Sequence, residues 1–341
     1  MPTNRQIVLT EIPQGKLSTD HLRLVDGAMP VPQDGELLVK VRYLSVDPAN
    51  RVYIKRAGYR PKVDAGDVMG AFAVAEVVES KAVGFARGDL VFCDTGWQEY
   101  AAVPATGALT LKLPDIEHRE HREPGEPISR LVSVYGVTAG YTSYVGLLKF
   151  GRPAPRETVV VSGAAGAVGS VVGQIAKIKG CRVVGIAGTA DKCAFLKQEL
   201  GFDAAIDYKT ENVAEALKTA APDGIDIYFD NVGGEILQAC AARMNRCGRI
   251  VICGAISGYD TGAEGAFGLA PQSVRNVSVV FFLVLNFLDE YARGVAELQG
   301  WVKDGRLKVN EDIIVGLENM PDALIGLLAG RNTGKRMVRV S

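Results

Sequence analysis

The sequence predicts an α/β protein that joins a β-rich lobe to a doubly wound parallel sheet. Strand-like and helix-like segments alternate over residues 157–253, which is typical of a parallel sheet covered by helices. Over residues 5–103, in contrast, short runs alternate apolar and polar residues, as expected for an all-β lobe. The chain has 341 residues, and roughly 100–200 residues per domain is usual, so two domains are expected.

A glycine-rich turn marks the centre of the predicted parallel sheet. The β-prone run 157–161 leads into the turn 164–169, with the sequence AAGAVG, and a helix is predicted over 167–179. This is a dinucleotide fingerprint in which alanine replaces the first glycine. Gly166 would let the backbone approach a pyrophosphate, and Gly169 would let the helix lie close to the strand. The expected phosphate-binding residues are Gly166, Ala167, Val168 and Gly169; the alternative is a tight turn that binds no ligand.

The segments after this turn complete the sheet. Further strands are predicted at 182–187, 204–206, 225–229 and 249–253, and helices at 191–200, 212–220 and 235–244. The apolar run 277–285 predicts one more strand, either at a sheet edge that pairs across a dimer or buried in the centre. A helix is predicted next, at 287–304. The tail from residue 310, with a helix at 321–328 and a strand at 335–340, is expected to return to the first lobe.

Composition and charge exclude several classes of partner. The chain carries 38 basic and 39 acidic residues, so its charge gives no case for nucleic acid or a membrane surface. Its longest apolar run is far shorter than the ~20 residues of a membrane span, and its start lacks the apolar region of a signal peptide. The six cysteines form no C-x-x-C pair. We therefore expect a cytoplasmic protein with reduced cysteines and a small-molecule partner.

The end of the second strand, residues 187–189, predicts the type of nicotinamide cofactor. Sites for NAD carry an acidic residue there, about 20 residues beyond the glycines, whereas this chain has Ala-Gly-Thr. Thr189 and Lys192 instead offer hydrogen bonds to the adenosine phosphate of NADP, and Tyr208 follows the third strand. The alternative for Lys192 is a solvated lysine at a helix start. Asp191 is interpreted as the N-cap of that helix.

Two further turns are expected at the ligand edge of the sheet, where the parallel strands end. They are 230–234, with the sequence DNVGG, and 254–259, with GAISGY. Asn231 can donate and accept hydrogen bonds towards a ribose and a nicotinamide; the alternative is a cap of the next helix. Tyr259 would lie beside the nicotinamide and is the candidate catalytic residue, with a packing role as the alternative.

Taken together, several segments resemble the medium-chain dehydrogenase/reductase superfamily and, within it, the zinc-free leukotriene/prostaglandin reductase branch, which includes curcumin- and alkenal-reducing enzymes. The resemblance covers essentially the whole chain. It is carried by SVDP at 45–48, GVT at 136–138, AAGAVG at 164–169, FDNVGG at 229–234, CGAIS at 253–257 and NTGK at 332–335. It implies a GroES-like, β-rich catalytic domain at 1–129 and 310–341, and an NADP-binding Rossmann domain at 130–309.

The resemblance also implies roles for individual residues. Those expected at the adenosine phosphate of NADP are Lys192 and Tyr208. Those expected at the ribose and nicotinamide are Asn231, Cys253, Gly254, Ala255, Ile256, Ser257 and Tyr259. The nicotinamide ring would be backed by Phe282, Leu283 and Val284, and reached from the tail by Asn332. Resembling proteins pair as homodimers, so a homodimer is expected.

No metal is expected at the reaction site. A catalytic zinc needs three protein ligands, and the histidines of the chain are His21, His118 and His121. His118 and His121 lie in a charged stretch and are interpreted as solvated. The segment 70–72, Gly-Ala-Phe, contains no ligand where zinc-dependent dehydrogenases carry Gly-His-Glu.

The segment after SVDP departs from the family pattern. Family members often continue with Tyr-Met-Arg, whereas this chain has Ala49, Asn50 and Arg51. Because the missing tyrosine would have lined the substrate pocket, substrate preference does not transfer. The expected pocket residues are Asn50, Tyr53 and Tyr59.

The implied activity is NADPH-dependent reduction of the C=C bond of an α,β-unsaturated ketone or aldehyde. Hydride would add to the β-carbon without a metal, and Tyr259 would donate a hydrogen bond to the carbonyl oxygen, where negative charge builds. Two alternatives stay open: a quinone reductase of the same superfamily, and a non-catalytic NADPH-binding redox sensor.

Overall fold

The chain forms two compact units. The computed structural model describes residues 3–58, 60–107, 110–113, 127–259 and 276–340. The first unit comprises Met1–Val132, Glu311–Asn332 and Arg336–Ser341, and the second comprises Ser133–Asn310 and Thr333–Lys335. None of the helices in the described part of the chain combines the length and hydropathy needed to cross a membrane.

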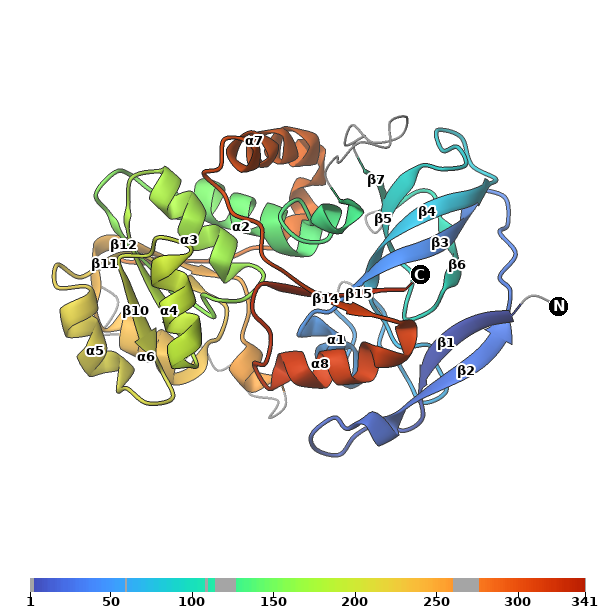
Figure 1. The fold of residues 1–341 in the computed structure, drawn as a ribbon, viewed down its shortest axis with the longest axis horizontal. Helices are drawn as coiled ribbons and strands as arrows, with labels where there is room; N and C mark the ends of the chain where they lie inside the picture. The colour runs from blue at the N-terminus through green and yellow to red at the C-terminus, as the bar shows by residue number, and fades with distance from the viewer. Residues whose placement is uncertain (1–2, 59, 108–109, 114–126, 260–275, 341) are drawn as a thin grey trace. The chain divides into compact units, whose positions relative to one another are not determined.

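The second unit is built on a parallel sheet of six strands (Figure 1). In chain order these are β8 (Thr158–Ser162), β9 (Arg182–Ala187), β10 (Ala204–Asp207), β11 (Ile225–Asp230), β12 (Met244–Ile252) and β13 (Ser278–Phe281). Their order in the sheet is β10-β9-β8-β11-β12-β13, and every neighbouring pair is parallel. The strand order therefore reverses between β8 and β11, which is where open parallel sheets bind their ligands. The predicted doubly wound sheet is confirmed.

Helices cover this sheet because each connection between parallel strands must cross one of its faces. The connecting helices are α3 (Gly169–Ile178), α4 (Ala190–Gln198), α5 (Val213–Ala220) and α6 (Gly234–Ala241). In the chain, α2 (Thr142–Val145) precedes β8 and α7 (Tyr291–Lys303) follows β13. The apolar faces of α5 and α6 are buried against the strands, with Leu217 and Leu237 packed in one cluster with Val160 and Ile186. This cluster fixes the carboxyl ends of the strands, on which the site depends.

The prediction for residues 277–304 is wrong in two respects. Strand β13 is shorter than predicted, because it ends at Phe281 and a 3-10 helix begins at Val284. Phe287 has a non-helical φ of −130°, so the regular helix starts at Tyr291 rather than at 287. Among the described strands β13 lies at the end of the strand order, and none of its residues is buried, so it is an edge strand and the alternative of a buried central strand is also wrong.

The helix predicted at 235–244 ends at Ala241, three residues early, because Met244 already pairs in β12. Strand β12 begins at Met244, five residues before the predicted start at 249. The other predicted strands and helices of the second unit are present, with ends shifted by at most two residues.

The first unit is the predicted β-rich lobe. Its strands are β1 (Thr3–Leu9), β2 (Leu22–Ala28), β3 (Glu36–Ser45), β4 (Phe72–Ser80), β5 (Leu90–Asp94), β6 (Tyr100–Pro104), β7 (Thr110–Lys112), β14 (Glu311–Val315) and β15 (Lys335–Arg339). Strands β1 and β2 form a separate hairpin, and the others form a sheet in the order β14-β15-β3-β4-β5-β7, with β6 paired to β3. Since β15 pairs antiparallel with β3, the tail returns to the first lobe as expected.

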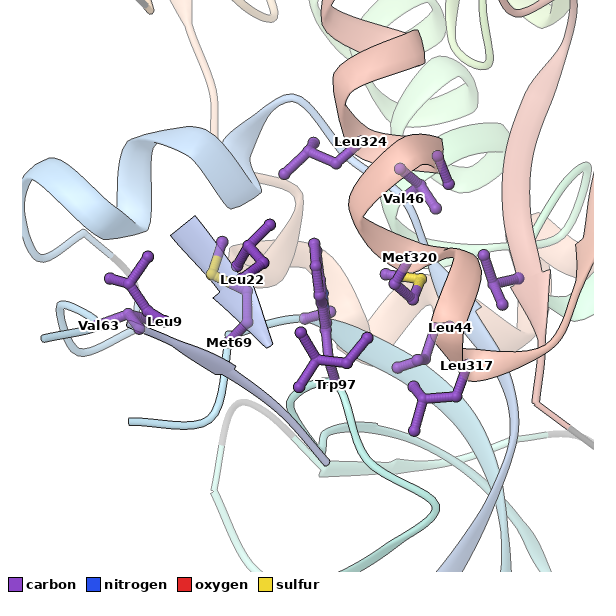
Figure 2. Close-up of a cluster of buried hydrophobic side chains, with 14 of the residues drawn as sticks. Leu9, Leu22, Leu44, Val46, Val63, Met69, Trp97, Leu317, Met320 and Leu324 are labelled. Atoms are coloured by element: carbon purple, nitrogen blue, oxygen red, sulfur yellow. The ribbon is translucent and has the colours of Figure 1, made fainter. Parts of the chain in front are cut away.

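The tail also closes the core of the first unit (Figure 2). Helix α8 (Met320–Leu328) places Met320 and Leu324 in one buried cluster with Leu44 of β3 and the Trp97 side chain. These side chains are fully or almost fully buried, and burying each such side chain stabilises the fold by about 1.5–3 kcal/mol. The segments Glu311–Asn332 and Arg336–Ser341 therefore belong to the first lobe, whereas Thr333–Lys335 belongs to the second unit.

An ion pair joins β12 to the residue before β8. Arg249 donates to both carboxylate oxygens of Glu157, at 2.8 and 2.6 Å. Burial raises the pKa of Glu157, but hydrogen bonds from Arg249 and from the Ala154 N–H lower it, and the net pKa lies below its ordinary value. A lowered pKa stabilises the folded state above the unfolded-state pKa, and this contribution is lost as pH falls through the folded-state pKa.

The Glu157→Gln variant is therefore expected to lose less stability than the wild type as pH falls below about 4.3. Urea-unfolding midpoints measured across this range give the comparison. Glu215→Gln is the control, because Glu215 pairs with Lys218 on the exposed surface of α5, where ion pairs contribute little. If the unfolding midpoints of the wild type and Glu157→Gln fall in parallel as pH decreases, Glu157 does not account for the loss of stability in acid.

Candidate functional site

The glycine-rich turn brings the start of α3 against the end of β8. A Cβ atom on Gly169 would lie 2.5 Å from the Gly163 carbonyl oxygen and 2.8 Å from the Ala164 Cα, both backbone atoms. Only glycine therefore allows this approach. Among the described residues, the N–H groups of Val168 and Gly169 have no acceptor. Such unpaired donors at a helix start fit the phosphate oxygens of a dinucleotide.

The backbone of segment 333–335 forms hydrogen bonds with this turn. Gly334, at φ +75°, donates its N–H to the Ala165 carbonyl at 2.8 Å and bridges to Gly166. Asn332, which precedes this segment, is buried. The tail thus reaches the glycine-rich turn through Gly334. That Asn332 reaches the nicotinamide stays a prediction.

The residues expected to bind an adenosine phosphate gather at the carboxyl ends of β9 and β10, where Ala187 and Asp207 are paired. The Thr189 hydroxyl accepts the Lys192 N–H at 3.3 Å and so caps α4. The expectation that Asp191 is the cap is wrong, because Thr189 has the extended backbone that a cap requires and Asp191 lies inside the first turn.

Tyr208 lies against the same strand end. Its N–H donates to the Ala187 carbonyl, and a Cβ atom on Gly188 would lie 2.8 Å from its ring. The absence of a side chain at 188 therefore lets the phenol ring lie beside the turn. Tyr208 is 45% exposed, which leaves it accessible at this edge of the sheet.

The turn after β11 is organised by a buried carboxylate. Asp230 has no exposed surface and accepts hydrogen bonds from the Tyr228 and Ser162 hydroxyls at 2.7 and 2.8 Å. It also accepts the N–H groups of Val232 and Gly233. Sequence reasoning singled out Asn231 and missed Asp230, because nothing in the local pattern shows that its carboxylate points inward.

Asn231 does not cap the next helix. Its side-chain N–H₂ donates to the Ser162 carbonyl at 2.7 Å, and its backbone N–H donates to the Ser162 hydroxyl oxygen at 2.9 Å. The N-cap of α6 is Gly233. The helix-cap alternative for Asn231 is therefore wrong.

The turn 253–259 is joined to the turn after β11. The Ser257 hydroxyl donates to the Val232 carbonyl at 2.6 Å, and the Tyr259 phenol oxygen accepts the Ala255 N–H at 3.3 Å. Burial, and then the charge of Asp230, raise the pKa of Cys253 to about 12, so this thiol is not a nucleophile. Backbone N–H groups that donate to residues 230–232 come from Cys253, Gly254, Ile256 and Ser257.

The segment after β13 packs partly inward. The Phe282 ring lies 5.4 Å from the Phe150 ring and 6.5 Å from the Phe229 ring, and Val284 is buried. Leu283, in contrast, is 36% exposed.

The expected pocket residues of the first unit belong to a polar cluster. Helix α1 (Ala49–Lys55) buries Asn50 and Tyr53, and the Asn50 side chain donates to the Gly70 carbonyl. Arg60 stacks over the Tyr53 ring at 4.9 Å and donates twice to Asp94. Sequence reasoning missed Arg60, whose guanidinium fills the space that a side chain at 70 would take. The expected pocket residue Tyr59 lies outside the described residues.

The described residues contain no group of three or more His, Cys, Asp or Glu side chains placed to hold a metal ion. His118 and His121 fall outside the described part of the chain.

A glycine-rich turn at the reversal point of a parallel sheet, joined in one chain to a β-rich lobe, defines a two-unit dinucleotide-dependent oxidoreductase. Residues 5–111 match the family model described as the N-terminal domain of oxidoreductase, and residues 167–299 match the model described as zinc-binding dehydrogenase. The chain belongs to the medium-chain dehydrogenase/reductase family, in the branch of the alkenal and prostaglandin reductases.

Individual relatives cover almost the whole chain. The NADPH-dependent curcumin reductase of Escherichia coli is 38% identical over 99% of this chain and 97% of its own length. Prostaglandin reductase 1 of Mus musculus is 44% identical over 96% of each chain. The crystal structure of CurA from Vibrio vulnificus in complex with NADPH is 37% identical, covers 99% of both chains and has a TM-score of 0.86.

Proposed function

We propose that the protein reduces the C=C bond of an α,β-unsaturated ketone or aldehyde with NADPH. The observation that carries this proposal is the similarity, over 96–99% of the chain, to NADPH-dependent curcumin reductase, prostaglandin reductase and 2-alkenal reductase. The protein is an NADP-dependent oxidoreductase. The second unit binds the cofactor, and the first unit supplies substrate contacts from Asn50, Tyr53 and Tyr59.

The residues of the second unit fit NADPH. The unpaired N–H groups at the start of α3 suit a pyrophosphate, and the absence of an acidic residue at the end of β9 suits a ribose that carries a phosphate. The residues proposed to hold the phosphates are Gly166, Ala167, Val168, Gly169, Thr189, Lys192 and Tyr208. Those proposed at the nicotinamide end are Asn231, Cys253, Gly254, Ala255, Ile256, Ser257, Phe282, Leu283, Val284 and Asn332.

When bound, NADPH supplies the hydride that adds to the β-carbon of the substrate. Tyr259 would stabilise the negative charge that forms on the carbonyl oxygen by donating a hydrogen bond from its O–H, and a proton from water would then add to the α-carbon to complete the saturated product. The Ala255 N–H, which donates to the Tyr259 oxygen, polarises the phenol and strengthens it as a donor. The chain offers this donor in place of a metal, and we propose that the reaction is zinc-independent.

Lys192→Ala is expected to weaken NADPH binding about tenfold or more while leaving NADH binding nearly unchanged. The reason is that a hydrogen bond to a charged group contributes about 1.5–3 kcal/mol, and NADH lacks the phosphate. Dissociation constants from nicotinamide fluorescence give the comparison. The matched control is Lys197→Ala, which removes another lysine from α4. Equal weakening of both cofactors would remove Lys192 from the phosphate site.

The proposed activity is tested by incubating purified protein with NADPH and parallel panels of enones and quinones. Identification of the saturated ketone or aldehyde, with no loss of rate in the presence of a chelator, is the expected result. Faster turnover of quinones would favour a quinone reductase instead. NADPH binding without consumption by any member of either panel would favour a non-catalytic sensor.

We also propose that the protein is a cytoplasmic homodimer paired through β13. This edge strand leaves Phe281 58% exposed, beside the partly exposed Leu283. An exposed apolar edge strand is a ready template for a second copy. Light scattering should give twice the mass of the chain, and Phe281→Lys should give a monomer; a monomeric wild type would contradict this assignment.

A further inference from the structure

The carboxylate of Asp230 is the most completely buried charge at the ligand edge of the second unit. It joins three segments, because its hydrogen bonds come from β8, from β11 and from the first residues of the turn before α6. Among the described residues, no Lys, Arg or His side chain forms an ion pair with it. The carboxylate is held by neutral donors alone, so its negative charge is not compensated locally.

Ser162 transmits the effect of this carboxylate to Asn231. Asp230 can only accept, so the Ser162 hydroxyl must donate to it, and the Ser162 oxygen is then left to accept the Asn231 N–H. The Ser162 carbonyl takes the side-chain N–H₂ of Asn231. The backbone N–H of Asn231 and one N–H of its side-chain amide are therefore used inside the protein. Among the described residues no donor meets the side-chain oxygen, which can therefore accept from a ligand. A hydroxyl donor, such as those of a ribose, fits an oxygen acceptor at this position.

The field of Asp230 extends over the same turns. After burial, its charge is the next cause that raises the pKa of the Cys253 thiol, and it acts in the same direction on Tyr228. A buried negative charge also favours any positive charge that forms nearby, because the interaction is weakly screened inside a protein. Oxidation of a nicotinamide creates such a positive charge on its ring.

We propose that Asp230 is a positioning residue of the cofactor site. Through Ser162 it fixes Asn231 as a hydrogen-bond acceptor for the ribose, and its uncompensated charge favours the oxidised over the reduced cofactor. This inference rests on the proposed function only for the identity of the cofactor, and no enone enters its test.

The test compares dissociation constants of NADP⁺ and NADPH in four proteins: wild type, Asp230→Asn, Ser162→Ala and Asp226→Asn. Asp230→Asn is expected to raise the dissociation constant of NADP⁺ about tenfold more than that of NADPH, because only NADP⁺ carries the positive charge on its nicotinamide ring. Ser162→Ala keeps the charge and loses the link to Asn231, so it is expected to weaken both forms equally, by about three- to tenfold.

Asp226→Asn is the matched control. Asp226 lies at the opposite end of β11 and also accepts from a β8 backbone N–H and from a side-chain amide, at 2.8 Å each. The Asp226→Asn variant is expected to bind NADP⁺ and NADPH with the affinities of the wild type. A second control is 2′,5′-ADP, which carries only the adenosine end; all four proteins should bind it equally if they are folded.

Three results would overturn the proposal. The first is equal weakening of NADP⁺ and NADPH by Asp230→Asn, which would leave the carboxylate a purely structural role. The second is unchanged cofactor binding in Ser162→Ala, which also decides the case if Asp230→Asn fails to fold. The third is an effect of Asp226→Asn equal to that of Asp230→Asn. Failure of the enone assays would leave these binding results intact, so the two proposals can fail separately.

Discussion

Tyr259→Phe is expected to lower turnover about a hundredfold and to leave NADPH affinity nearly unchanged. Loss of one donor to a developing oxyanion typically costs about 2.7–4 kcal/mol in the transition state, and the ground-state complex does not depend on that donor. The phenol oxygen accepts the Ala255 N–H at 3.3 Å, so the substitution also removes a long and weak hydrogen bond of the turn. Steady-state kinetics with an enone measure the effect on turnover, and a separate binding titration measures the effect on NADPH affinity.

Tyr144→Phe is the control for this variant. Tyr144 lies in α2, and its hydroxyl donates to Glu297 at 2.7 Å, so the same atom is removed from the same unit. Turnover of Tyr144→Phe should match the wild type. If Tyr259→Phe also turns over at the wild-type rate, Tyr259 has no part in the reaction and is a packing residue. A loss of NADPH affinity that accounts for the whole decrease would place its role in binding instead.

Gly169→Ala is expected to abolish most NADPH binding and to destabilise the second unit. The new Cβ atom would meet the Gly163 carbonyl oxygen at 2.5 Å and the Ala164 Cα at 2.8 Å. These are backbone atoms, so no rotamer change relieves the contact and α3 must move away from β8. Overpacking of this kind costs about 1–3 kcal/mol, and the displaced N–H groups no longer meet the pyrophosphate. We expect an affinity loss of about a hundredfold, to which stability and lost phosphate contacts both contribute.

Gly300→Ala is the matched glycine control. Gly300 lies inside α7, and beyond its chain neighbours and the backbone of its own helix no atom of the described residues lies within 4 Å of the position where its Cβ would be added. The added methyl group should stabilise the helix by about 0.5–1 kcal/mol, because alanine loses less backbone freedom than glycine on folding. Thermal unfolding and calorimetric titration with NADPH measure both variants. Wild-type affinity in Gly169→Ala would mean that close approach of α3 to the turn is not needed for binding.

Local sequence patterns determined the fold class and the order of the elements. The β-prone run 157–161, the glycines that follow it and the helix period after them give the strand-turn-helix order that is typical of a parallel sheet. The missing acidic residue after Ala187 could be seen in the sequence alone, as could the glycines at 166 and 169. Together with the resemblance carried by segments such as 229–234, these patterns gave the family correctly, because each depends on residues close together in the chain.

Only the tertiary structure decided which side chains meet. Ser162 and Asp230 are 68 residues apart, and Arg60 and Asp94 are 34 apart, so no local period shows either pair. The same reason explains the errors: β13 ends early because a 3-10 helix begins at Val284, and Thr189 rather than Asp191 caps α4 because of its backbone conformation. The sheet also decided that β13 lies at an edge, where the sequence had left two alternatives. Periodicity reports which face of an element is buried, whereas the partner of a polar group depends on how distant segments pack together.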